Sequence, residues 1–134
     1  MAKYVIDAEC ALRIVKEGVQ IPSDVQILAP TLLRSQVLDR LFQKRLNGEL
    51  SIEAALALNE KFAKRKFRYL GDAVLRRRAW EIAIQLKMTS TYDAEYIALV
   101  QLQADAMIAE DGRLVKLAKP LVAVQPFETL LRQG

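Results

Sequence analysis

The chain has 134 residues, of which 52% are hydrophobic and 27% are charged, and its formal net charge is +4. This length suits a single domain, residues 1–134, with a sizeable core, and the hydrophobic fraction excludes a disordered chain. Because histidine is absent and Cys10 is the only cysteine, histidine-dependent serine or cysteine hydrolases are excluded, and a bound metal ion needs oxygen ligands.

The first half of the chain alternates apolar strand-like runs with helical periodicity. An Asn-Gly pair at 47–48 and a Pro-Ser-Asp turn at 22–24 separate the segments. Ser51 is expected to cap a helix, because its hydroxyl can accept an amide of the first turn. The predicted elements are a strand at 3–6, a helix ending at Gly18, a strand at 25–28, a helix from Pro30 to Asn47 and a helix from Ser51 to about Lys64.

The second half continues the alternation after the Gly-Asp pair at 71–72. Asp72 and Thr91 are expected to cap two helices, and Pro120 to stop a third. The predicted elements are a helix at 73–86, a helix from about Asp93, a strand at 106–109, a helical turn or two through Leu114 and Leu117, a strand at 121–124 and a short helix at 127–131.

Strands that alternate with helices predict an α/β fold with a parallel sheet covered on both faces. Ligands of such sheets bind at the carboxyl ends of the strands. Asp7 and Asp111 both follow predicted strands, and Asp93 lies at a helix N-terminus that can lean over the same edge. The pattern therefore places three carboxylates where they could hold a divalent cation against a phosphate.

Four segments, 4–8, 29–38, 91–99 and 107–114, carry a family resemblance in their order and spacing. The most specific is Thr-Tyr-Asp-Ala-Glu-Tyr-Ile-Ala-Leu at 91–99. Together they resemble the PIN-domain ribonucleases, in particular the VapC-type toxins of bacterial toxin–antitoxin pairs, over essentially the whole chain. The resemblance implies a PIN-like three-layer sandwich with a central parallel sheet and helices on both faces.

The resemblance also implies a metal-dependent ribonuclease that hydrolyses RNA with metal-activated water. Asp7, Asp93 and Asp111 match the family's catalytic acids, which hold Mg²⁺ or Mn²⁺. Gln36 stands where the family has a glutamate, and it could serve as a weak ligand or bind a metal-bound water. Glu9 replaces the family's small hydroxyl residue, and we expect it to act as a substitute metal ligand.

Each of these acids also has a purely structural interpretation. An aspartate between a strand and a helix is often only an N-cap, which applies to Asp7 and Asp93. A glutamate in a first helical turn, such as Glu9, suits the helix dipole. Asp105 and Glu110 are nearby alternatives to Asp111. Ala109 stands where the family usually has a threonine.

Basic residues concentrate in the middle of the chain, where they favour contact with RNA phosphates. Phe67 and Tyr69 lie among them and could stack on bases. Lysine and arginine on helix faces also serve solubility, so the pattern supports both interpretations. The candidate RNA-binding residues are Arg65, Lys66, Arg68, Arg76 and Arg77.

The resemblance implies three partners: an RNA substrate, a small cognate antitoxin and a second copy in a homodimer. Met1 leads directly into a predicted strand, and no apolar run reaches the roughly 18 residues of a membrane span, so we expect a cytoplasmic protein without a membrane contact. Cys10 is expected to be a buried core thiol.

Two other functions compete with the nuclease. A degenerate PIN domain, with a metal site weakened by Gln36, would bind RNA or protein without cutting. A receiver-type phosphoacceptor domain also gathers acids at strand ends. The spacing of Asp7 and Glu9 and the position of Lys116 fit that domain poorly.

Overall fold

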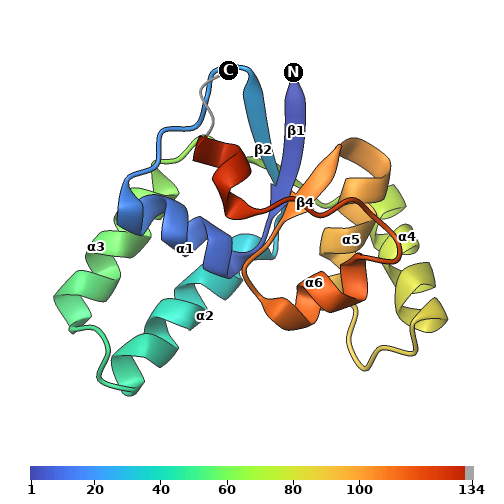
Figure 1. The fold of residues 1–134 in the computed structure, drawn as a ribbon. Coiled ribbons are helices and arrows are strands. Elements are labelled where there is room, and N and C mark those ends of the chain that lie inside the picture. Colours follow the sequence, from blue (N-terminus) through green and yellow to red (C-terminus); the bar gives the residue numbers. More distant parts are fainter. Residues whose placement is uncertain (132–134) are drawn as a thin grey trace.

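The computed structural model describes residues 1–131, and in them four parallel strands form one sheet in the order β3-β2-β1-β4 (Figure 1). The central strand β1 pairs with β2 on one side and with β4 on the other, so segments about 100 residues apart lie side by side. The strands are β1 (Ala2–Ile6), β2 (Val25–Pro30), β3 (Arg68–Leu70) and β4 (Ala106–Ile108).

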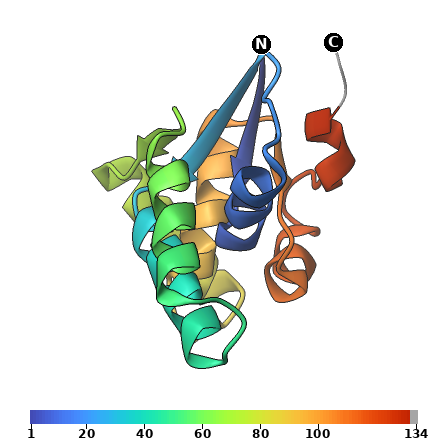
Figure 2. The ribbon, with the colours of Figure 1, turned by 90° about the vertical axis from the view of Figure 1, so that its left-hand side faces the viewer.

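Helices cover both faces of this sheet. Figure 2 shows α1 and α5 on opposite sides of β1 and β2, while α2 and α3 extend past the strand ends. α5 packs against β1, β2 and β4, and α4 packs on the outside of α5. The helices are α1 (Ala8–Glu17), α2 (Leu33–Leu46), α3 (Ile52–Ala63), α4 (Ala73–Gln85), α5 (Tyr92–Gln103), α6 (Gly112–Ala118) and the 3-10 helix η1 (Phe127–Leu131).

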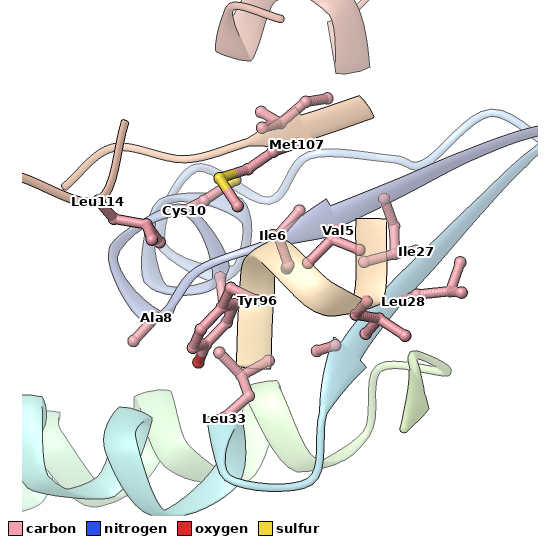
Figure 3. Close-up of a cluster of buried hydrophobic side chains, with 14 of the residues drawn as sticks. Val5, Ile6, Ala8, Cys10, Ile27, Leu28, Leu33, Tyr96, Met107 and Leu114 are labelled. Carbon is pink, nitrogen blue, oxygen red and sulfur yellow. The ribbon is translucent and has the colours of Figure 1, made fainter. Parts of the chain in front are cut away.

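The core lies on both sides of β1. Val5 and Ile6 are both fully buried although neighbouring strand residues point to opposite faces. Figure 3 shows Cys10 and Met107 on one side of Ile6, with Tyr96 on the other. Burial raises the pKa of the Cys10 thiol, and the charge of Asp7 raises it further. The expectation of a buried core thiol is confirmed.

Side-chain caps begin four of the described helices, α1, α3, α4 and α6. Asp7 accepts the N–H of Cys10 (2.9 Å), and Asp72 accepts that of Leu75 (2.9 Å), as an N-cap carboxylate does. The predicted Ser51 cap is also present, with an N–H···Oγ distance of 3.0 Å to Ala54. These local interactions fix where α1, α3 and α4 start.

The structure corrects three details of the predicted elements. Pro30 ends β2 instead of starting a helix, because its backbone pairs with β3, a strand that the sequence pattern missed. Thr91 makes no side-chain cap; Ser90 Oγ accepts the N–H of Tyr92 instead. Of the strand predicted at 121–124, only Val124 forms a bridge, to Met107.

None of the helices in the described part of the chain has the length and apolar composition that crossing a membrane requires.

Candidate functional site

Asp7 lies at the carboxyl edge of the sheet, between β1 and α1, and only 4% of its surface is exposed. Its Oδ1 accepts the N–H of Cys10, and its Oδ2 accepts that of Asp111 (2.9 Å). The N–H of Glu110 contacts both oxygens at 3.2 Å. Asp7 is therefore both a helix cap and a bridge from β1 to the segment that follows β4.

The electrostatic environment of Asp7 contains opposing influences. Burial raises the pKa of its carboxyl group, the three backbone N–H groups lower it, and the nearby charge of Asp111 raises it again. The net shift is upward. The carboxylate is thus held in place by hydrogen bonds in an environment that disfavours its negative charge.

Asp111 is the second acid at this edge. It caps α6 by accepting the N–H of Arg113 at Oδ1 (3.0 Å), while its Oδ2 lies 3.5 Å from Nη2 of Arg40. Its own N–H is bonded to Asp7. The structure therefore brings Asp7 and Asp111 together, as their positions after β1 and β4 predict. Glu110, the alternative at this position, pairs with Arg13 on α1.

Glu9 and Asp93 extend the acidic region in two directions. Glu9, in the first turn of α1, accepts a hydrogen bond from Arg40 Nη1 (2.7 Å). Asp93, in the first turn of α5, forms an ion pair with Arg113 of α6. The side chain of Asp93 is only 15% exposed, whereas that of Arg113 is 69% exposed.

Gln36 is also engaged within the site. Its Oε1 accepts a hydrogen bond from the hydroxyl group of Tyr96, which is 1% exposed. Burial raises the pKa of Tyr96, and the negative charges of Asp7 and Asp93 raise it further. Tyr96 therefore stays protonated as a donor, and it lies close enough to Asp7 and Asp93 for both charges to act on it.

The chemistry of this donor set fits a hard divalent cation, since it offers only oxygen ligands at a low-exposure edge. The side chains are not gathered as a ready-made metal centre, and within residues 1–131 no group of three acidic or cysteine side chains is placed to hold an ion. Arg40 and Arg113 instead neutralise Glu9, Asp111 and Asp93.

The candidate RNA-binding residues fall into two groups. Arg65 donates from Nη1 to the carbonyl of Val19 (2.7 Å), which gives it a structural contact between the chain after α3 and the chain after α1. Phe67 packs against Phe62, and the guanidinium of Arg34 lies over the ring of Tyr69, so both aromatic rings have intramolecular partners. The remaining candidates are exposed: Lys66, Arg68, Arg76 and Arg77.

A cavity of about 510 Å³ opens beside Asp93, between the loop after α4 and α6. Lys87, Arg113 and Lys116 contribute positive charge to its lining, together with the polar side chains of Thr89 and Ser90. These cations line the same cavity as the candidate acid Asp93, whereas the RNA-binding candidates predicted from the sequence do not line it. The cavity is suited in charge to phosphate groups.

Sequence reasoning missed three residues of the site: Arg40, Tyr96 and Arg113. Arg40 follows Gln36 by four positions, which puts both on one face of α2, and this spacing was an available signal. Arg113 follows Asp111 by two residues and caps nothing itself. Its pairing with Asp93 depends on how α5 and α6 pack, which no local pattern encodes.

No protein-family model matches the sequence, and no curated protein matches it either. Among solved structures, PAE2754 from Pyrobaculum aerophilum has a TM-score of 0.75 to this chain, with 20% identity over 97% of this chain and 93% of its own. VapBC-1 from nontypeable Haemophilus influenzae has a TM-score of 0.63, with 13% identity over 93% of this chain and 98% of its own. The PIN-like fold is confirmed. At these identities the likeness concerns the fold, so activity has to be argued from the site.

Proposed function

We propose that this PIN-like domain is a metal-dependent ribonuclease that hydrolyses RNA phosphodiester bonds. The observation that carries the proposal is the meeting of Asp7 and Asp111 at the carboxyl edge of a parallel sheet, with Asp93, at the start of α5, paired to Arg113 two residues after Asp111. Ligands of open parallel sheets bind at this edge. The segments that resemble VapC-type toxins contain these same three acids.

Asp7 and Asp111 are the proposed principal holders of a Mg²⁺ or Mn²⁺ ion, with Asp93 and Glu9 as further ligands. When bound, such an ion lowers the pKa of a coordinated water and offsets negative charge on the phosphate. Asp7 is oriented for this role by three backbone N–H groups, which leave its carboxylate little rotational freedom. The hydroxyl group of Tyr96 donates a hydrogen bond to the amide oxygen of Gln36, and this bond keeps the Gln36 side chain oriented.

The proposed path of RNA runs through the cavity beside Asp93. Lys87 and Lys116 supply positive charge there, and Arg113 adds a planar guanidinium that can contact a phosphate in two places. RNA contacts of this kind weaken as salt concentration rises. Replacing Lys87 and Lys116 with glutamate is therefore expected to weaken binding and cleavage more than the same change at Lys66, an exposed lysine outside this cavity.

Calorimetric titration with Mn²⁺ and cleavage of a fluorescently labelled RNA test the proposal together. The wild type is expected to bind Mn²⁺ and to cut RNA, and both properties are expected to fall at least about 100-fold in Asp7→Asn. Asp39→Asn, at an exposed position of α2, is the matched control. A wild-type protein that binds no divalent ion at millimolar concentration would rule out the nuclease.

A second function is favoured by the arginine contacts of the acids. With Glu9 and Asp111 paired to Arg40 and Asp93 paired to Arg113, the domain could bind RNA or a protein without cutting. Fluorescence anisotropy separates the two functions. RNA binding that persists without cleavage, with or without Mn²⁺, would support the binding module and reject the nuclease.

On the basis of the resemblance to VapC-type toxins, we also propose a small antitoxin as a partner of this chain. VapBC-1, one of the structures with this fold, carries the name of such a pair. An apolar face of α2 and α3 is available for a partner segment, with a cavity of about 400 Å³. Its large apolar side chains are each more than half exposed: Leu38, Phe42, Leu46, Ile52 and Leu56. Phe42→Asp is expected to abolish co-purification with the product of an adjacent short gene.

A further inference from the structure

Arg40 reaches into the acidic site from α2. Its Nη1 lies 2.7 Å from Oε1 of Glu9, and its Nη2 lies 3.5 Å from Oδ2 of Asp111. The two nitrogens of one guanidinium thus contact acids from two different elements, α1 and the start of α6. The Arg40 side chain is 38% exposed, so these contacts are partly shielded from water.

The surrounding charges explain why this arginine is held here. Burial lowers the pKa of Arg40, but the hydrogen bond that Arg40 donates to Glu9 and the charges of Glu9, Asp111 and Asp7 raise it, and the net shift is upward. Three negative groups therefore act on one cation. A hydrogen bond between ionised groups is stronger than one between neutral groups, especially where water is partly excluded.

Arg40 also lies one helical turn after Gln36, on the same face of α2. This face of α2 therefore carries the neutral amide of Gln36 and, one helical turn later, the positive charge of Arg40. Positive charge near Glu9 and Asp111 and a neutral group at position 36 both make the site less negative than four carboxylates would be. A divalent cation entering such a site meets a resident positive charge.

We infer that Arg40 is an internal counter-cation of the acid site, and that a divalent metal ion must displace its guanidinium from Glu9 and Asp111 in order to bind. The inference rests on the proposed metal site and specifies how that site is controlled. Without metal, Arg40 stabilises the folded chain by neutralising clustered acids. With metal, the same acids turn to the ion, and the guanidinium moves toward solvent.

Mn²⁺ titration of the full chain by calorimetry, with Arg40→Gln beside the wild type, tests this inference without any RNA. Glutamine keeps polar contacts but removes the charge. We expect the Mn²⁺ dissociation constant to fall by about tenfold, because one charge-assisted contact no longer has to be broken. Thermal unfolding without metal is expected to occur at a lower temperature in Arg40→Gln, and added Mn²⁺ is expected to raise that temperature by more than in the wild type.

Two further variants control the experiment. Arg78→Gln removes one positive charge from α4, where Arg78 contacts Gln101 and Glu81, and is expected to leave Mn²⁺ affinity unchanged. Arg40→Lys keeps the charge but has a single side-chain nitrogen, so it cannot contact both acids as the planar guanidinium does. Its affinity for Mn²⁺ should therefore lie between those of the wild type and Arg40→Gln.

The outcomes separate this inference from the proposed nuclease. If the wild type binds Mn²⁺ and Arg40→Gln binds it no more tightly, the inference is overturned and the nuclease stands. If only Arg40→Gln binds Mn²⁺, the inference is upheld and the wild type is not a metal-dependent nuclease. If neither protein binds Mn²⁺, both are overturned.

Discussion

The two ends of the acidic site hold their carboxylates by different means. Asp7 is buried, and backbone N–H groups from three residues hold it in place. Asp93 is paired with the side chain of Arg113, which is more than two-thirds exposed. Backbone amides belong to the fold and cannot be withdrawn without local unfolding. An exposed arginine can leave its partner through side-chain rotation alone.

Asp7 therefore has a structural role in the site, whereas the acids that are paired with arginines can exchange their partners. The anchored acid is expected to contribute to stability whether or not a metal ion is bound. The acids paired with arginines, at Glu9, Asp93 and Asp111, are expected to contribute less to stability than Asp7 does and to respond to ions.

Replacing Asp7 with alanine is expected to lower the free energy of unfolding by about 2–4 kcal/mol, because it leaves backbone N–H groups in the first turn of α1 and in the segment after β4 without an acceptor. Urea unfolding without metal measures this effect. The exposed control Asp39→Ala should stay within about 0.5 kcal/mol of the wild type. Equal stability of the two variants would show that Asp7 does not anchor the fold.

Replacing Gln36 with glutamate is expected to tighten Mn²⁺ binding by about tenfold, because affinity for hard cations rises with the number of charged oxygen ligands. Tyr96 can donate to the new carboxylate as it does to the amide. Calorimetry and RNA cleavage would both register the change. No gain in Gln36→Glu, together with a loss in Glu9→Gln, would instead indicate that Glu9 already replaces the missing acid.

Replacing Arg113 with glutamine is expected to change stability by less than about 1 kcal/mol, as for most exposed ion pairs. Mn²⁺ affinity should nevertheless increase a few-fold as Asp93 is released. Thermal unfolding and calorimetry on the same sample compare the two effects. A large loss of stability would place Asp93 with Asp7 among the anchored acids.

The smallest effect concerns pH. The pKa of Asp7 is raised in the folded protein above its ordinary value of 3.8, so the folded state binds more protons than the unfolded state just above that pH. Stability from this group is therefore greatest below the ordinary pKa and is lost as pH rises through the raised pKa. Urea unfolding at a series of acidic pH values should show this slope in the wild type and not in Asp7→Asn. Identical slopes would contradict the raised pKa.

Some of this arrangement follows from local sequence, and some does not. The positions of Asp7 and Asp111 follow from apolar runs that end in an acid, because parallel strands share a carboxyl edge. The caps at Ser51 and Asp72 follow from side chains that reach amides three residues away. Such features depend on a few neighbouring residues and were predicted correctly.

Apart from the cap at Thr91, where the neighbouring Ser90 accepts the N–H of Tyr92 instead, the missed features depend on packing between distant segments. β3 has only three residues and is defined by its pairing with β2, so no periodicity marks it. Arg40 contacts Glu9 and Asp111 only because α1, α2 and the start of α6 converge. Gln36 was recognised as a departure from a family pattern, but its bond to Tyr96 joins residues 60 positions apart. The partners of such long side chains are determined by the tertiary structure and not by the neighbouring sequence.

The bridge from Asp7 to Glu110 and Asp111 spans 103 and 104 positions of the chain, which has a consequence for protein synthesis. A ribosome adds about 5–20 residues per second, so Asp7 is made roughly 5–20 s before these partners. During that interval β1 lacks β4, and the carboxylate can be held only by the N–H of Cys10. Asp7 therefore stays apart from Asp111 in the growing chain until the segment that follows β4 has been made.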